Sequence, residues 1–263
     1  MYRIGFIGCG NMGGAMLQGI VSQGIVDPSE IIVSARSQET VDAVHERYGV
    51  DVTLDNTKAC RASVVFLAVK PQMYEAVIAQ IAPHMDEDAV LVSIAPGKSL
   101  AWLEEKSGMR KVVRLMPNTP AAVGEGMTAV VPGDACEDAD IEAVLSLVNS
   151  FGASEIVPER LIDAATAAAG CSPAFVYMFI ESMADAAVAE GMARAQAYRF
   201  ASQAVLGAAK MVLESGQHPG ALKDAVCSPG GTTIEGVRVL EQRGMRSAVA
   251  EALIATVAKA QRL

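Results

Sequence analysis

Residues 4–13 read Ile4-Gly5-Phe6-Ile7-Gly8-Cys9-Gly10-Asn11-Met12-Gly13, and this pattern is the strongest indication of the architecture of the chain. A short β-branched run leads into the spacing G-x-G-x-x-G, and a helical stretch follows from Met12. In this spacing Gly8 makes the tight turn, Gly10 lets the backbone approach a pyrophosphate, and Gly13 lets the helix pack on the strand. The strand–turn–helix context favours dinucleotide binding over a purely structural glycine turn.

The sequence beyond this stretch alternates between strand-like and helix-like segments. β-branched runs predict strands at residues 3–7, 31–34, 64–69, 90–94, 112–115 and 128–131. Helical stretches are expected between them, at residues 12–23, 39–48, 72–82 and 99–106. This alternation predicts an α/β fold with a doubly wound parallel sheet.

The texture of the sequence changes at Val157-Pro158, after which almost nothing resembles a strand. Helical runs continue to the end, with breaks expected near Ser172-Pro173, near Gly191 and in two turns further on. We therefore expect a dinucleotide-binding domain at residues 1–157 and an all-helical domain at residues 158–263. The small residues of the helical domain suggest that it packs against a second copy of itself.

Composition excludes several classes of protein. The net charge is −9 and no basic stripe is visible, which argues against a nucleic-acid partner. The five cysteines are widely spaced without a C-x-x-C pair, and there are only three histidines, so no metal site is expected. No stretch reaches the roughly 20 apolar residues that span a bilayer. These features predict a soluble, cytoplasmic protein.

The end of the second predicted strand bears on the choice of dinucleotide. It reads Val33-Ser34-Ala35-Arg36-Ser37, whereas an NAD-preferring site usually has an acid about 20 residues after the glycine loop. The first acid here is Glu39. Arg36, between Ser34 and Ser37, could pair with a 2′-phosphate, or it could be a solvated loop charge. We favour NADP, because the missing acid and the arginine indicate the same cofactor.

Two further strand ends should face the same crevice, because ligands of open α/β sheets lie beyond the carboxyl ends of the strands. They read Ala68-Val69-Lys70-Pro71 and Ile94-Ala95-Pro96-Gly97. Lys70 is either a cofactor contact or a surface charge. The pair Asn118-Thr119 could contact nicotinamide or ribose, or could form a capped turn before Pro120.

A second glycine turn lies near the C-terminus, where Ser228-Pro229-Gly230-Gly231-Thr232-Thr233 precedes an amphipathic run at residues 234–240. Adjacent glycines reach backbone angles that other residues avoid. Free N–H groups at the start of a helix can bind a carboxylate or a phosphate. The alternative is a capped turn between two helices.

Four segments together resemble pyrroline-5-carboxylate reductase, the last enzyme of proline synthesis. They read Phe6-Ile7-Gly8-Cys9-Gly10-Asn11-Met12-Gly13, Phe66-Leu67-Ala68-Val69-Lys70-Pro71-Gln72, Arg114-Leu115-Met116-Pro117-Asn118-Thr119-Pro120 and Ser228-Pro229-Gly230-Gly231-Thr232-Thr233. The resemblance implies an N-terminal Rossmann-type domain and a C-terminal all-helical dimerisation domain that interlocks with a partner subunit, giving a homodimer or a higher homo-oligomer. It also implies NADPH, or less favourably NADH, as the hydride donor for reducing 1-pyrroline-5-carboxylate to L-proline.

The resemblance also implies site residues. Cofactor contacts fall on Ile7, Gly8, Cys9, Gly10, Asn11, Met12, the region of Arg36, Asn56, Ala68, Val69, Lys70, Ile94, Ala95 and Pro96. Substrate contacts fall on Glu159, Val226, Cys227, Ser228, Gly230, Gly231, Thr232 and Thr233, with Thr233 near the substrate nitrogen as the catalytic residue. The chain departs from the family at Gly170-Cys171-Ser172-Pro173-Ala174, where Gly-Ser-Gly-Pro-Ala is usual.

Three other polar residues have open assignments. Arg114 could pair with a substrate carboxylate, but bracing of the Asn118 loop is favoured. Glu159 either bonds the substrate nitrogen or simply occupies a helix start, where an acid is favourable. His218 is expected to shape a helix start.

The chemistry agrees with what the sequence lacks. An iminium nitrogen already carries its proton near neutral pH, so the protein must mainly align the imine with the nicotinamide and hold the carboxylate. A 3-hydroxyacid dehydrogenase would be expected to carry a catalytic Lys, yet residues 159–194 contain no Lys and no His. A non-catalytic NADP-binding module is the other alternative, and the Ser228–Thr233 turn argues against it.

Overall fold

The computed structural model describes residues 2–262. The chain forms two compact units. The first extends to Cys171 and includes the residues from Val257 onward, and the second is Ser172–Thr256.

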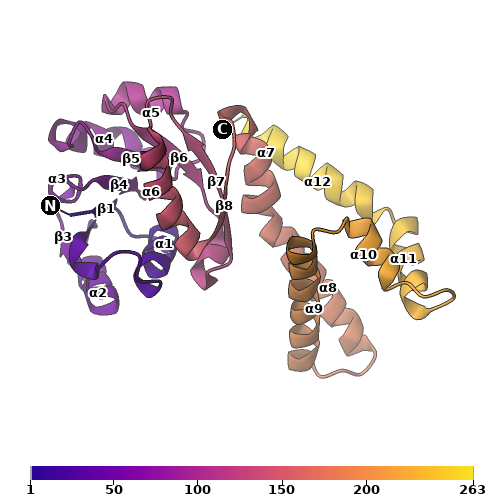
Figure 1. Cartoon of the computed structure of the whole chain (residues 1–263). Helices are drawn as coiled ribbons and strands as arrows, with labels where there is room; N and C mark the ends of the chain where they lie inside the picture. Colours follow the sequence, from indigo (N-terminus) through magenta and orange to yellow (C-terminus); the bar gives the residue numbers. More distant parts are fainter. Residues whose placement is uncertain (1, 263) are drawn as a thin grey trace. The chain divides into compact units, whose positions relative to one another are not determined.

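The first unit contains an eight-stranded sheet with the order β3-β2-β1-β4-β5-β6-β7-β8 (Figure 1). The strands are β1 (Ile4–Ile7), β2 (Ile31–Ser34), β3 (Asp51–Thr53), β4 (Val64–Leu67), β5 (Val90–Ser93), β6 (Val112–Met116), β7 (Gly126–Pro132) and β8 (Gly152–Ile156). All neighbouring strands are parallel except β6 and β7, which are antiparallel. The strand order reverses between β1 and β4, which is where doubly wound sheets bind ligands.

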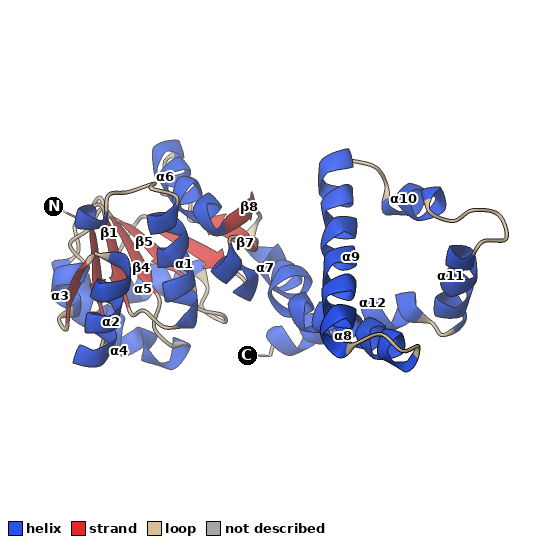
Figure 2. Ribbon diagram, turned by 90° about the horizontal axis from the view of Figure 1, so that it is seen from below, coloured by secondary structure: helices blue, strands red, loops and turns tan. Residues whose placement is uncertain are grey.

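Helices cover both faces of this sheet (Figure 2). Side chains of α1 (Asn11–Ser22), α2 (Gln38–Tyr48) and α6 (Asp138–Val148) share one core cluster with Ile4 and Phe6 of β1. Those of α3 (Asn56–Ala59), α4 (Tyr74–Ile81) and α5 (Leu100–Ser107) share the other with Ile7. Because both faces are covered, the inner strands are continuous apolar runs instead of alternating ones.

Several elements differ from the sequence prediction. Four were not predicted, namely β3, β8, α3 and α6. β3 and β8 are the two edge strands, half-exposed and partly polar, so neither shows an apolar run. The sheet is also mixed instead of wholly parallel, because β7 runs antiparallel to β6. A mixed edge of this kind is common in large doubly wound sheets.

The second unit is helical and has a small core. Its helices are α8 (Ser172–Ala189), α9 (Arg194–Ser215), α10 (Pro219–Ala225), α11 (Thr232–Gln242) and most of α12 (Met245–Ala260). The buried core cluster of this unit consists of Ala184, Ala197 and Ala201, where α8 and α9 pack together. Large apolar side chains such as Phe200 and Leu213 are exposed, at 67% and 83%.

The predicted break at Ser172-Pro173 is wrong. α7 (Ile162–Ala165) runs through a π-helical turn at Thr166–Cys171 directly into α8. Proline lacks the N–H that an α-helix needs. A wider π turn changes the pairing at this point and lets the helix pass Pro173 without ending.

The expectation that no stretch could span a membrane is also wrong by length and composition. The continuous helical stretch Glu159–Ala189 has a mean hydropathy of 1.2. Many of its residues are alanines, which raise the hydropathy without giving a long run of large apolar side chains. Protein-covered helices meet the same criterion, so this stretch alone is weak evidence for a membrane span.

Candidate functional site

The glycine loop after β1 is closed on one side and open on the other. Gly8 has a φ of 89°, and a Cβ there would lie 2.8 Å from Cγ1 of Val69. A Cβ at Gly13 would lie 3.0 Å from that of Ala68. A Cβ at Gly10 would meet no atom of the described chain within 4 Å. The loop therefore fits tightly against the end of β4 and leaves space above Gly10.

The helix that follows this loop begins without a side-chain cap. α1 starts at Asn11 with Gly10 as its N-cap, and its first turn contains no acidic residue. The first N–H groups of a helix have no partner within it, and they favour an anion such as phosphate. Ile7 is buried at the end of β1 and Met12 packs partly on the core, so both would act mainly through their backbones.

The ends of β4 and β5 are joined by Tyr74, a residue that the sequence analysis did not select. Its hydroxyl donates to the Leu67 carbonyl at 2.6 Å and accepts from the Ser93 hydroxyl and the Ile94 N–H, each at 3.3 Å. Burial raises the pKa of Tyr74 to about 12. No sequence motif marks this tyrosine, which reads as an ordinary helix residue.

These bonds hold the two predicted cofactor segments that follow β4 and β5. In the segment that follows β5, Ala95 is buried and donates its N–H to the Ser93 hydroxyl at 3.4 Å, while Pro96 is exposed. In the first segment Lys70 is exposed and makes no ion pair within the described chain. Its ammonium group is therefore available to a ligand.

The end of β2 meets the start of α3. The buried Ser34 hydroxyl lies 2.8 Å from Asn56 Oδ1, so these two predicted cofactor residues are in contact. Ser37 caps α2 by accepting a hydrogen bond from the Thr40 N–H at 3.4 Å. Arg36, which lies between Ser34 and Ser37 in the sequence, is exposed. Its side chain can reach a ligand without breaking an existing contact.

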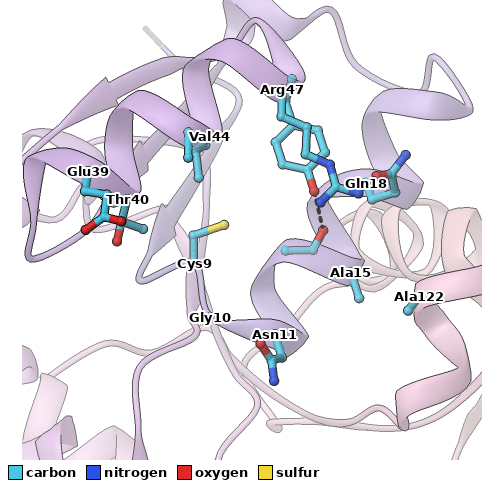
Figure 3. Close-up of a pocket in the computed structure, with 13 residues that line it drawn as sticks. Cys9, Gly10, Asn11, Ala15, Gln18, Glu39, Thr40, Val44, Arg47 and Ala122 are labelled. Carbon is cyan, nitrogen blue, oxygen red and sulfur yellow. Dashed lines mark hydrogen bonds between the residues drawn. The ribbon is translucent and has the colours of Figure 1, made fainter.

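A groove of about 620 Å³ opens between α1 and α2 beside the glycine loop (Figure 3). Its walls include Cys9 and Asn11 on one side, and Glu39 on the other. Arg47 of α2 crosses to Gln18 of α1, with its Nη2 atom 2.8 Å from Oε1 of Gln18. The volume is within the range of small-molecule sites. The glycine motif predicts the loop residues of this groove but not its α2 wall, because a local motif contains no information on helix packing.

The Cys9 thiol in this groove is not activated as a nucleophile. Burial raises the pKa of its thiol to about 11, and the nearby charge of Arg47 offsets only part of that change. The thiol therefore keeps its proton near neutral pH. It serves as a packing residue in the loop and does not have the character of a nucleophile.

Glu159 and Arg114 form an ion pair that links β6 to the start of the helical stretch Glu159–Ala189. Arg114 Nη1 contacts Glu159 Oε1, which also accepts the Leu100 N–H at 2.8 Å. The Arg114 side chain is buried, with 7% exposed, and that of Glu159 is 36% exposed. The expectation that Arg114 braces the Asn118 loop is thus wrong, because its partner is Glu159. The two residues are 45 positions apart in the sequence, so no local pattern indicates that they pair.

Asn118 is buried and bridges two elements. Its Oδ1 accepts the Met127 N–H, and its Nδ2 donates to the Ala169 carbonyl, both at 2.9 Å. In a regular α-helix the Ala169 carbonyl would accept from residue 173, which is a proline without an N–H. Asn118 therefore satisfies a carbonyl that Pro173 cannot. A cofactor contact from this side chain would have to use its remaining hydrogen.

The second glycine turn lies in the helical unit. α11 begins at Thr232 with Gly231 as its N-cap, and no side chain caps it. Gly230 has a φ of 66°, and the Gly231 N–H donates to the Ser228 carbonyl at 3.0 Å. Thr233, one residue into the helix, is exposed. The turn thus lies at a helix start that no side chain caps, where the first N–H groups have no partner within the helix.

The remaining substrate candidates of this unit precede the turn. Val226 ends α10, and the Cys227 N–H donates to the Asp224 carbonyl at 3.0 Å. His218 caps the start of α10 by accepting the Gly220 N–H at 3.0 Å, which confirms its predicted structural role. Residues 2–262 contain no group of three or more His, Cys, Asp or Glu side chains placed to hold a metal ion.

Comparison with known proteins gives matches over the whole chain. The family described as "Pyrroline-5-carboxylate reductase dimerisation" matches residues 159–263, and "NADP oxidoreductase coenzyme F420-dependent" matches residues 3–97. A pyrroline-5-carboxylate reductase of Escherichia coli (strain K12) is 49% identical over 263 residues, covering 99% of this chain and 98% of the relative. The chain belongs to the pyrroline-5-carboxylate reductase family.

Solved structures of the pyrroline-5-carboxylate reductase family agree. A reductase from Coxiella burnetii superposes with a TM-score of 0.94 at 33% identity, covering 99% of this chain and 98% of that one. One from Plasmodium falciparum, solved with NADP bound, gives 0.88 at 32% identity, covering 99% and 97%. The predicted fold class, family and pyrroline-5-carboxylate reductase activity in proline biosynthesis are thereby confirmed. The alternatives of a 3-hydroxyacid dehydrogenase and a non-catalytic module are set aside.

Proposed function

We propose that this reductase uses NADPH in preference to NADH to reduce 1-pyrroline-5-carboxylate to L-proline. Residues 1–157 bind the dinucleotide, and residues 158–263 bind the substrate and a second copy of the chain. The observation that carries the cofactor proposal is the exposed Arg36 at the end of β2, where no acid occupies the position that holds a ribose 2′-hydroxyl in NAD sites. Its guanidinium can pair with the 2′-phosphate.

The N–H groups at the uncapped start of α1 would hold the pyrophosphate, in the space above Gly10. Support comes from the open side of Gly10 and from the close fit of Gly8 against Val69, which together leave one face of the loop for a ligand. The segments Ala68–Lys70 and Ile94–Pro96, at the ends of β4 and β5, would hold the ribose and nicotinamide. The described residues thus supply backbone N–H groups, Lys70 and Arg36 to a cofactor with several negative charges.

The substrate carboxylate is bound by the N–H groups at the start of α11, and the Thr233 hydroxyl orients the ring nitrogen. Backbone donors suit a carboxylate because they carry no side-chain entropy cost. Glu159 contributes a carboxylate oxygen as an acceptor for the substrate N–H. The bound cofactor supplies the hydride, and the protein's part is to align the imine carbon and hold the carboxylate.

The assembly is a homodimer formed through the C-terminal helices, or a larger oligomer built from such dimers. Support comes from the dimerisation family match and from the exposed apolar side chains of the helical unit. A second copy would also cover the apolar stretch Glu159–Ala189, so we place the protein in the cytoplasm and not in a membrane.

Two variants test the assignment of the second glycine turn. Thr233→Val keeps the side-chain shape but removes the hydroxyl, so turnover should fall while NADPH binding, measured alone, changes little. A Cβ at Gly231 would lie 2.3 Å from Oγ of Ser228 and 3.2 Å from its carbonyl oxygen, so Gly231→Ala should displace the Ser228 side chain, disturb the turn and mainly raise the substrate KM. Proline should inhibit the wild type competitively and lose affinity in the Gly231 variant.

The matched control is Gly207→Ala, in the same unit, where an added Cβ meets no atom of the described chain within 4 Å. Its kinetic constants should equal those of the wild type. If Thr233→Val retains full turnover, its hydroxyl does not orient the nitrogen. An unchanged substrate KM in Gly231→Ala would remove the carboxylate from this turn.

A further inference from the structure

A buried tyrosine hydroxyl joins the two strand ends that border the proposed cofactor site. Tyr74 is the first residue of α4 and is fully buried among the side chains of the core cluster that contains Leu67 and Leu91. No part of the proposed chemistry uses it. Its position in the core and its hydrogen bonds at the carboxyl edge of the sheet together suggest a second role.

The hydrogen-bonding capacity of this hydroxyl is completely used. Its proton goes to the Leu67 carbonyl at 2.6 Å, and its oxygen accepts from the Ser93 hydroxyl and the Ile94 N–H at 3.3 Å each. The Ser93 oxygen in turn accepts the Ala95 N–H at 3.4 Å. Two successive N–H groups after β5 are therefore held by one small network.

The network lies where the β4–β5 ladder ends. Leu67 and Ser93 are the last register partners of these two strands. Beyond them the chains separate, and their buried backbone groups need partners that the ladder no longer supplies. Tyr74 supplies those partners to both strands at once, so the spacing of the two following segments depends on its hydroxyl.

We propose that Tyr74 is a positioning residue for the dinucleotide, which sets the spacing of the segments Ala68–Lys70 and Ile94–Pro96 around it. This rests on the proposed function, which places the cofactor along these segments. β1 separates β4 from β2, whose end carries Arg36. Tyr74 therefore acts on the part of the cofactor that NADPH and NADH share.

The test is Tyr74→Phe, which keeps the ring in the core and removes only the hydroxyl. The Leu67 carbonyl and the Ile94 N–H then lose their shared partner, and the two segments become free to shift. We expect the Kd of both NADPH and NADH, titrated by fluorescence without substrate, to rise about tenfold, as for the loss of one buried hydrogen-bonded group. Ser93→Ala removes two bonds of the same network, the one to the Tyr74 hydroxyl and the one from the Ala95 N–H. Both are long, at 3.3 and 3.4 Å, so we expect both Kd values to rise only about threefold.

Tyr2→Phe is the matched control, because the Tyr2 hydroxyl bonds Asp51 Oδ2 at 2.6 Å at the amino ends of the strands. It should leave both Kd values unchanged. Arg36→Ala, in contrast, should weaken NADPH alone. Equal weakening of the two dinucleotides in Tyr74→Phe therefore separates positioning from recognition of the 2′-phosphate.

A lower Tm in Tyr74→Phe with unchanged dinucleotide Kd values would show a purely structural role and overturn the proposal. The same rise in Tyr2→Phe would overturn it too, because the effect would then be general loosening. If Tyr74→Phe does not fold, the outcome for Ser93→Ala decides. A wild type that binds neither dinucleotide would instead reject the proposed function.

Discussion

Arg36 is the residue on which the choice of cofactor depends. It is exposed at the end of β2, and no carboxylate of the loop competes for it. Arg36→Ala should weaken NADPH binding by about 1.5–3 kcal/mol, because a charged hydrogen bond to the 2′-phosphate is lost. NADH, which has no such phosphate, should bind nearly as before. Steady-state kinetics with each dinucleotide measures the difference.

Arg61→Ala is the control for this experiment, since Arg61 is also exposed but lines a separate hollow with Tyr2 and His84. It should change neither cofactor. Equal losses for NADPH and NADH in Arg36→Ala would mean that this arginine does not recognise the 2′-phosphate.

Cys9 gives a prediction about pH. Its thiol has a pKa of about 11 in the folded chain, against an ordinary value of 9.0, because burial disfavours the thiolate. Between these two values the unfolded chain loses the proton first, so the free energy of unfolding falls as pH rises from about 9 to about 11. Cys9→Ala should remove this component and make the fall shallower.

Chemical denaturation of wild type and Cys9→Ala at several pH values in that window measures the two slopes. Tyr74, whose pKa is raised from 10.0 to about 12, also lowers the free energy of unfolding, at higher pH. The free energy of unfolding of Cys9→Ala should therefore still depend on pH. Identical slopes in the two proteins would show that the Cys9 thiol is not buried as described.

Between elements, the Arg114–Glu159 pair joins β6 of the sheet to the start of the helical stretch Glu159–Ala189. Glu159→Gln removes the charge that faces the buried Arg114 and should lower the free energy of unfolding by about 2 kcal/mol. The double variant Arg114→Met/Glu159→Gln should lose less than the sum of the single variants, because neither partner is then left unpaired. Urea denaturation gives all the required values.

The control pair is Lys210–Glu214, an exposed i,i+4 pair on α9. Glu214→Gln should cost about 0.5 kcal/mol or less. Strictly additive losses in the Arg114–Glu159 cycle would show that the two side chains do not interact in solution.

Elements whose formation depends on local sequence could be predicted, and elements that depend on distant contacts could not. β1, β2, β4, β5 and β6 have buried faces on both sides, and apolar runs identified all of them. The edge strands β3 and β8 could not be predicted, because half-exposed strands of mixed polarity have no apolar run.

The residues of the candidate site also fall into two groups, those that local sequence predicts and those that it does not. The glycine loops follow from backbone requirements that are visible in the local sequence. The G-x-G-x-x-G spacing indicates Gly8 and Gly10, and two adjacent glycines before an amphipathic run indicate Gly231. Tyr74 and the partner of Arg114 depend on contacts between distant segments, which no local pattern contains. The passage of the helix through Pro173 depends likewise on a wider turn, and Asn118 takes up the carbonyl that this proline leaves unpaired.

The exposed apolar surface of the helical unit predicts that the chain self-associates. An apolar groove of about 610 Å³ in the helical unit is lined by residues such as Leu240, Val249 and Ile254. We expect light scattering to show at least a dimer, and Val249→Asp to weaken it, because a charge would be buried in the interface. Val123→Asp, on an exposed residue of the other unit, should leave the assembly unchanged. A fully active monomer at nanomolar concentration would contradict this.

The three buried alanines that form the core of the helical unit have a consequence for how a newly made chain reaches its active form. The N-terminal sheet has its own large core and can fold as an isolated event, at a rate independent of protein concentration. The helices gain most of their burial only on meeting another chain, so their final ordering is a bimolecular step. Recovery of activity after dilution from denaturant should then follow second-order kinetics at low concentration, even though the dinucleotide site forms first.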